Sequence, residues 1–180
     1  DPECTTRPYQ EMIADFPLFR QGLHKQHLPC WDEIARVVRD FQPDMVGTSA
    51  MTVYLESAWK VLEIAKKTLP DVLTVLGGPA VTANPHAAML NPCVDLSVSG
   101  EGEAAAVKLV DALEGGDSSD LDSIAGLSWR GHTGALYRNE RGPWVDVNTV
   151  RLPARDLLSF KPYPADLFGT MVTARGRPYR

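Results

Sequence analysis

Helical and strand-like patterns alternate between Trp31 and Leu113, and this alternation constrains the fold more than any other feature. Short runs that suit buried strands are each followed by a turn and an amphipathic stretch. The expected strands are Met45–Ser49, Val72–Leu76 and Val94–Val98, and the expected helices are Trp31–Phe41, Leu55–Leu69, His86–Leu90 and one from Gly102 to Leu113. Alternating strands and helices favour a parallel sheet, because each connection crosses a face of the sheet. We therefore predict an α/β fold with a doubly wound, Rossmann- or flavodoxin-like parallel sheet.

The pattern changes on both sides of this region. Residues 114–120 are polar, contain glycine and lack apolar periodicity, so we expect a boundary there. Beyond it, Gly126–Arg130 and Ala135–Arg138 suit a β-hairpin, and Thr170–Ala174 suits one more strand. The sequence thus predicts an irregular N-terminal arm (1–30), an α/β domain (31–116), and a small β-hairpin and linker region (117–180).

Composition excludes several classes of protein. The net charge is −5, so the chain lacks a basic face for a nucleic-acid backbone. No apolar run approaches the roughly 20 residues of a membrane span, and no signal peptide opens the chain. We expect a cytoplasmic protein without nucleic acid as a partner.

The sequence also lacks the usual spacings of catalytic and metal sites. Cys4, Cys30 and Cys93 are far apart and form no C-x-x-C pair, so we expect reduced thiols and neither a disulfide framework nor a zinc site. No Ser/His/Asp, paired-carboxylate or lysine constellation is evident by spacing. We therefore assign neither catalytic residues nor metal ligands within this chain.

Glycines and hydroxyl residues follow each of the three expected strands. They are Ser49 and Thr52, then Gly77 and Gly78 with Thr82 nearby, then Gly100 to Gly102. Ligands of open α/β sheets bind outside the carboxyl ends of the strands, so these residues should line one crevice. Glycine lets a ligand approach the backbone where a Cβ would collide, and we expect Gly78 to leave room for a bulky cofactor tail. Ordinary turns between strands and helices are the alternative explanation of each glycine.

These turns carry a resemblance to a known family. Ser49-Ala50-Met51, followed after twenty-five residues by Gly77-Gly78, resembles the S-x-L and G-G elements of cobalamin-binding domains. With residues 79–82 and Gly100-Glu101-Gly102-Glu103, the pattern resembles more narrowly the domain that precedes the catalytic barrel of B12-dependent radical S-adenosylmethionine enzymes. The similarity continues through residues 124–127, 152–158 and 173–176, and so extends from about Trp31 to the end. It implies cobalamin as a ligand, and methyl transfer or radical rearrangement as the chemistry of the whole enzyme.

The same resemblance implies which residues contact cobalamin. They are Ser49, Ala50, Met51, Thr52, Gly77, Gly78, Pro79, Thr82, Gly100, Glu101 and Gly102. The first two turns would flank the nucleotide tail and the lower corrin face, and the third would close the pocket. Glu101 would bind a corrin amide or simply favour the start of a helix through its charge. Met51, Tyr54 and Trp59 suit core packing as well as contact with the corrin.

Three departures from the family pattern qualify the prediction. No D-x-H-x-x-G motif is present, so cobalamin is expected base-off without a protein imidazole, and His24, His27, His86 and His132 are expected on the surface. No β-α-β unit precedes the arm, so we expect a longer parent chain and weak cobalamin binding by this chain in isolation. Arg177 stands where the first cluster cysteine belongs, so the 4Fe–4S cluster and S-adenosylmethionine are expected only with a radical S-adenosylmethionine barrel, in the same or a longer chain. This chain alone is not expected to be catalytic.

Two other functions compete with this one. The first is a degenerate cobalamin-binding sensor or interaction module that has lost catalysis, which Arg177 favours. The second is an α/β domain that binds a nucleotide phosphate, although Gly77-Gly78-Pro79 matches neither G-x-G-x-x-G nor the P-loop.

Overall fold

The computed structural model describes residues 29–115, 118–131, 133–143, 146, 148–152, 154 and 157. The chain divides into a larger unit, residues 8–144, and a smaller one formed by residues 1–7 and 145–180. The expected strand Thr170–Ala174, Arg177 and nearly all of the N-terminal arm lie outside the described residues. In the smaller unit, the backbone and side-chain N–H groups of Asn148 donate to the carboxylate of Asp146 at 2.9 and 2.8 Å, which forms a local turn.

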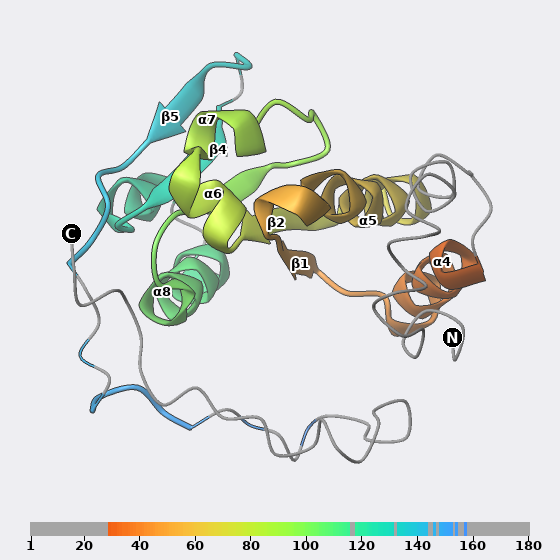
Figure 1. The fold of residues 1–180 in the computed structure, drawn as a ribbon, viewed down its shortest axis with the longest axis horizontal. Coiled ribbons are helices and arrows are strands. Elements are labelled where there is room, and N and C mark those ends of the chain that lie inside the picture. The colour runs from red at the N-terminus through yellow and green to blue at the C-terminus, as the bar shows by residue number, and fades with distance from the viewer. Residues whose placement is uncertain are drawn as a thin grey trace, which may run out of the picture. The chain divides into compact units, whose positions relative to one another are not determined.

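A five-stranded sheet in the order β1-β2-β3-β4-β5 forms the centre of the larger unit (Figure 1). The strands are β1 Met45–Ser49, β2 Leu73–Gly77, β3 Leu96–Val98, β4 Leu127–Arg130 and β5 Leu136–Arg138. The first three strands are parallel, whereas β4 runs antiparallel to both β3 and β5. The predicted hairpin therefore exists as β4 and β5, but it extends the same sheet, which is mixed rather than wholly parallel. A boundary near residue 117 does not separate the hairpin from that sheet.

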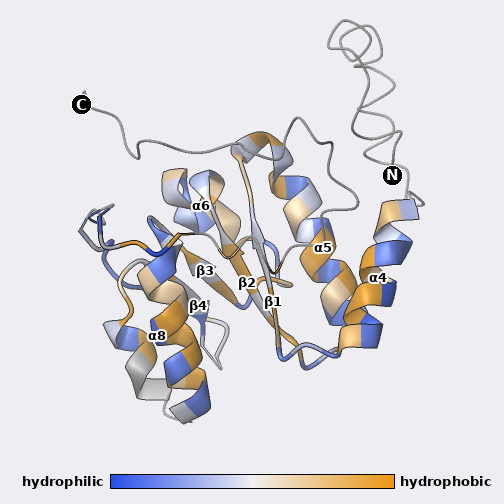
Figure 2. Ribbon diagram, turned by 90° about the horizontal axis from the view of Figure 1, so that it is seen from below, coloured by the Kyte–Doolittle hydropathy of each residue, from blue (hydrophilic) through white to orange (hydrophobic). Residues whose placement is uncertain are grey.

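Helices cover both faces of the sheet (Figure 2). The α-helices are α4 Pro29–Phe41, α5 Leu55–Thr68, α6 Pro79–Ala83, α7 Pro85–Ala88 and α8 Gly102–Gly115, and the 3-10 turns are η1 Thr52–Tyr54 and η2 Ser118–Ser123. The side chain of Asn84 accepts the N–H of Ala87 at 3.0 Å, as expected for the N-cap of α7. No helix among the described residues is long and apolar enough to cross a membrane.

Two buried clusters, one on each face of the sheet, hold the helices in place. On one face Leu62 of α5 packs with Leu76 of β2, and on the other Leu109 of α8 packs with Leu127 of β4. Helix α4 packs beside α5 around Val38, which is 6% exposed. This arrangement confirms the predicted doubly wound α/β fold.

A polar network fixes the amino ends of β2 and β3. The side chain of Thr74 is fully buried, and its hydroxyl lies 2.6 Å from the carbonyl oxygen of Cys93 and 2.9 Å from the carboxylate of Asp95. The same carboxylate oxygen accepts the backbone N–H of Thr74 at 2.9 Å and lies 2.7 Å from Nζ of Lys66. Asp95 therefore joins β2, α5 and the segment entering β3, because buried polar groups need such partners.

Candidate functional site

The turns after β1 and β2 pack directly on each other. The backbone N–H of Ala50 donates to the carbonyl oxygen of Gly77 at 3.0 Å, and the N–H of Ala80 donates to the carbonyl oxygen of Ala50 at 2.9 Å. Ser49 lies opposite Gly77 in the parallel ladder. The predicted residues of these two turns therefore meet at the carboxyl edge of the sheet.

Thr82 links the second turn to the third. Its hydroxyl donates to the carbonyl oxygen of Gly78 at 3.2 Å and accepts the backbone N–H of Gly100 at 2.9 Å. Gly100 follows β3, so all three turns lie along one edge, as predicted from the order of strands and glycines. We call residues 49–54, 77–82 and 99–102 together the turn row.

Gly78 does not leave room for a ligand, and that expectation is wrong. Its φ is +95°, and a Cβ at this position would lie 2.8 Å from the nitrogen and 2.9 Å from the oxygen of Ala50, with the Ser49 hydroxyl closer still. The obstructing atoms belong to the protein itself. The space beside Gly78 is therefore used by the turn after β1, and the missing Cβ does not by itself make room for a ligand.

The open part of the turn row lies on either side of this contact. Three apolar residues in and before η1 are largely exposed: Met51 at 58%, Val53 at 78% and Tyr54 at 55%. A Cβ on Gly102, at the start of α8, would meet no atom within 4 Å. A bulky ligand can therefore approach the row at η1 and at Gly102. Trp59 instead packs on the core and donates its indole N–H to the carbonyl oxygen of Ala88 at 3.1 Å.

The segment after β5 also reaches this edge, although no sequence motif marks it. The N–H of Gly126 donates to the carbonyl oxygen of Glu140 at 2.7 Å, and the N–H of Ser99 donates to the carbonyl oxygen of Gly126 at 2.9 Å. A Cβ on Gly100 would lie 3.0 Å from Nε of Arg141, so this arginine lies across the third turn. Only its position just after a hairpin could have drawn attention to it.

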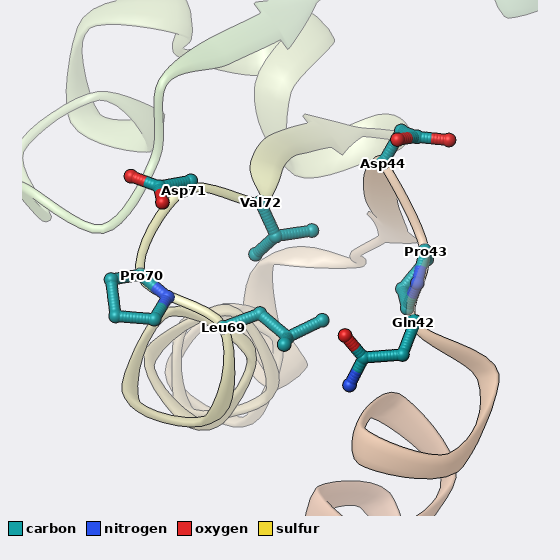
Figure 3. A pocket seen from close by; sticks show the side chains of 7 residues that line it. All are labelled: Gln42, Pro43, Asp44, Leu69, Pro70, Asp71 and Val72. Carbon is teal, nitrogen blue, oxygen red and sulfur yellow. The ribbon is translucent and has the colours of Figure 1, made fainter.

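Described residues line at least two cavities, and none of the described residues that line these two is a predicted site residue. One, of about 470 Å³, lies beside the segment Arg138, Asn139, Glu140 and Arg141. The other, of about 320 Å³, is lined by Gln42, Pro43, Asp44, Leu69, Pro70, Asp71 and Val72 (Figure 3). It lies where the chain enters β1 and β2, at the end of the sheet opposite the turn row. The carboxylates of Asp44 and Asp71 point away from its centre, so we assign it no site.

The described residues bring no metal-binding cluster together. Among them, no group of three His, Cys, Asp or Glu side chains could hold a metal ion. His86 is exposed on α7, whereas His24, His27, His132 and Cys4 lie outside the described residues. Cys30 and Cys93 are free thiols; burial, and next the negative charge of Glu63, raise the pKa of Cys93.

The fold and the turn row together define a ligand-binding α/β domain. Residues 20–110, which are about half of the chain, match the family model described as the B12 binding domain. The chain belongs to this family of cobalamin-binding domains, as the turns at the carboxyl edge predicted.

Relatives of the chain include cobalamin-dependent enzymes. The chain is 38% identical over 153 residues to an uncharacterised methyltransferase of Pyrococcus horikoshii, covering 83% of this chain and 33% of the relative. It is 33% identical over 141 residues to the cobalamin-dependent radical SAM methyltransferase TokK of Streptomyces tokunonensis. This match covers 77% of this chain and 19% of TokK. Its fold resembles that of the radical S-adenosylmethionine methyltransferase TsrM of Kitasatospora setae, with a TM-score of 0.53 and 19% sequence identity. The match covers 62% of this chain and 22% of TsrM. The chain thus spans a third or less of these relatives.

Proposed function

We propose that this chain is the cobalamin-binding part of a B12-dependent radical S-adenosylmethionine enzyme that transfers methyl groups. The observation that carries the proposal is the turn row, in which Thr82 ties the Gly78 and Gly100 turns together at the carboxyl edge. Membership of the B12-binding family and the two methyltransferase relatives support it. The barrel with its 4Fe–4S cluster and S-adenosylmethionine would belong to the same chain in the full-length protein.

The residues of the turn row suit a large, mixed polar and apolar ligand. The exposed side chains of Met51, Val53 and Tyr54 can cover an apolar face of the corrin, and the open backbone at Gly102 allows close approach. The turn row is held together by the close packing of Gly78 on Ser49 and Ala50. When bound, cobalamin supplies a cobalt centre that carries the methyl group, and the protein supplies burial and orientation.

We propose further that cobalamin binds base-off and without a histidine ligand. The sequence has no D-x-H-x-x-G motif, and the described His86 lies on α7 rather than in the turn row. Exclusion of the benzimidazole from cobalt would follow from its burial with the nucleotide tail. An absorption spectrum of the bound cofactor distinguishes the base-off from the base-on form.

Gly102→Leu is expected to weaken binding of hydroxocobalamin by the full-length protein at least about tenfold, which corresponds to about 1.4 kcal/mol. The added side chain would occupy the open space where the ligand approaches, while α8 tolerates leucine. The matched control is Gly115→Leu at the other end of α8, where a Cβ also meets no atom within 4 Å. A titration followed by absorbance measures both affinities. Equal affinities for the two variants would place the ligand away from Gly102.

A second candidate function is a cobalamin-binding module without catalysis. Arg177 favours it, because a guanidinium cannot ligate iron at the position of a cluster cysteine. The two functions differ in whether S-adenosylmethionine is consumed: an enzyme of the proposed class consumes it, and a binding module does not. An assay of its consumption by the reduced full-length protein separates them.

A further inference from the structure

Arg141 has a defined place on the third turn of the row. A Cβ on Gly100 would lie 3.0 Å from its Nε, 3.4 Å from its Cγ and 3.7 Å from its Cδ. Both the aliphatic part and the guanidinium of the side chain therefore run along the backbone of Gly100. A larger residue at position 100, where φ is +95°, would displace them.

The backbone near Arg141 is fixed by several long-range contacts. The side-chain amide of Asn139 donates to the carbonyl oxygens of Leu121 and Ile124 at 2.7 and 2.9 Å. A Cβ on Gly142 would lie 3.1 Å from the Cβ of Ala125, so the chain on the other side of Arg141 is also packed closely. The segment is thus held against the loop that precedes β4, and that loop is bonded to Ser99. Because the backbone on both sides of Arg141 is held by these contacts, its guanidinium is kept beside the turn row.

The cavity beside this segment suits an anionic group. Its volume is about 470 Å³, and two arginines and one glutamate are among its lining residues. The described lining residues therefore carry a net positive charge, in a chain whose net charge is −5. Arginine presents its N–H groups in a planar fork that matches the oxygens of a phosphate.

We propose that Arg141 determines specificity for complete cobalamins by binding the phosphodiester of the nucleotide tail. This inference rests on the proposed cobalamin-binding function. The phosphodiester is the fixed anionic group of cobalamin, and it lies in the tail rather than in the corrin ring. A guanidinium next to Gly100 would thus select corrinoids that carry a tail over those that lack one.

The test compares two corrinoids and four forms of the full-length protein. Hydroxocobalamin has the nucleotide tail and its phosphate, whereas diaquacobinamide lacks both. Wild type, Arg141→Gln, Arg141→Lys and the control Arg36→Gln are titrated with each corrinoid and followed by absorbance, and circular dichroism and thermal melting verify the fold. Arg36 is an exposed arginine on α4 that pairs with Asp40 at 3.4 Å, so its replacement makes the same change of charge away from the site.

Arg141→Gln is expected to weaken hydroxocobalamin binding about tenfold or more and to change diaquacobinamide binding by less than about twofold, because only a charge-assisted bond to the phosphate is lost. Arg141→Lys should retain part of the affinity, and it replaces Arg141→Gln in the comparison if the latter does not fold. Equal weakening of both corrinoids, or no weakening of either, would overturn the inference. If wild type binds neither corrinoid, the proposed function fails; if it binds both and Arg141→Gln matches Arg36→Gln, only this inference fails.

Discussion

Gly78→Ala is expected to destabilise the folded protein by about 3 kcal/mol, because one methyl group adds both backbone strain and a steric clash. At φ +95° an L-residue other than glycine is strained, and the new Cβ would lie 2.8 Å from the nitrogen of Ala50. Neither turn can move away easily, since the backbone of Ala50 is hydrogen-bonded to both Gly77 and Ala80. The loss should be seen as a lower urea midpoint with an unchanged slope.

The matched control adds the same methyl group where space is available. Gly102→Ala lies at the start of α8, and its Cβ would meet no atom within 4 Å. We expect a change in the free energy of unfolding within about 1 kcal/mol, because the added methyl group meets no atom and alanine restricts the unfolded chain. Equal urea midpoints for the two variants would show that Gly78 is not required for the packing of the turns.

Asp95→Ala is expected to cost roughly 3 kcal/mol of stability, because its carboxylate satisfies polar groups of Thr74 that are buried. The N–H of Thr74 would lose its acceptor at 2.9 Å, and its hydroxyl would lose one neighbour. The ion pair with Lys66 contributes less, since the two side chains are 24% and 30% exposed and solvent screens their charges.

The control for this network is Asp71→Ala at the same end of the sheet. Asp71 is exposed, so its removal should change the free energy of unfolding by less than about 0.5 kcal/mol. Thermal and urea unfolding of both variants measure the difference. If Asp95→Ala is as stable as Asp71→Ala, the network does not hold β2 and β3 together.

Sequence patterns predicted most of the fold because its elements depend on local signals. The strand Met45–Ser49 follows Gln42-Pro43-Asp44, which ends the preceding helix, and the observed β1 has the same bounds. Helix α6 was missed because Gly78-Pro79 indicates a turn, although proline is equally compatible with the first position of a helix. The pairing of β3 with β4 was also missed, because contacts between distant segments leave no local pattern.

The candidate site was predictable where topology decides and unpredictable where packing decides. Parallel strands place their carboxyl ends together, so Ser49, Gly77 and Gly100 were expected on one edge and lie there. A sequence cannot show whether a missing Cβ makes room for a ligand or for the protein, and at Gly78 the protein fills the space. Arg141 reaches the site through a chain reversal that depends on β4 and β5, so no spacing in the sequence marks it.

Hydrogen exchange of the full-length protein with and without hydroxocobalamin tests the central claim most directly, because it locates the ligand on the fold. The account predicts that bound cobalamin slows exchange in the turn row, which comprises residues 49–54, 77–82 and 99–102. Residues 42–44 and 69–72, which contribute to the cavity at the opposite end of the sheet, should exchange at the same rate in both states. Protection confined to that opposite end, with no change in the turn row, would contradict it.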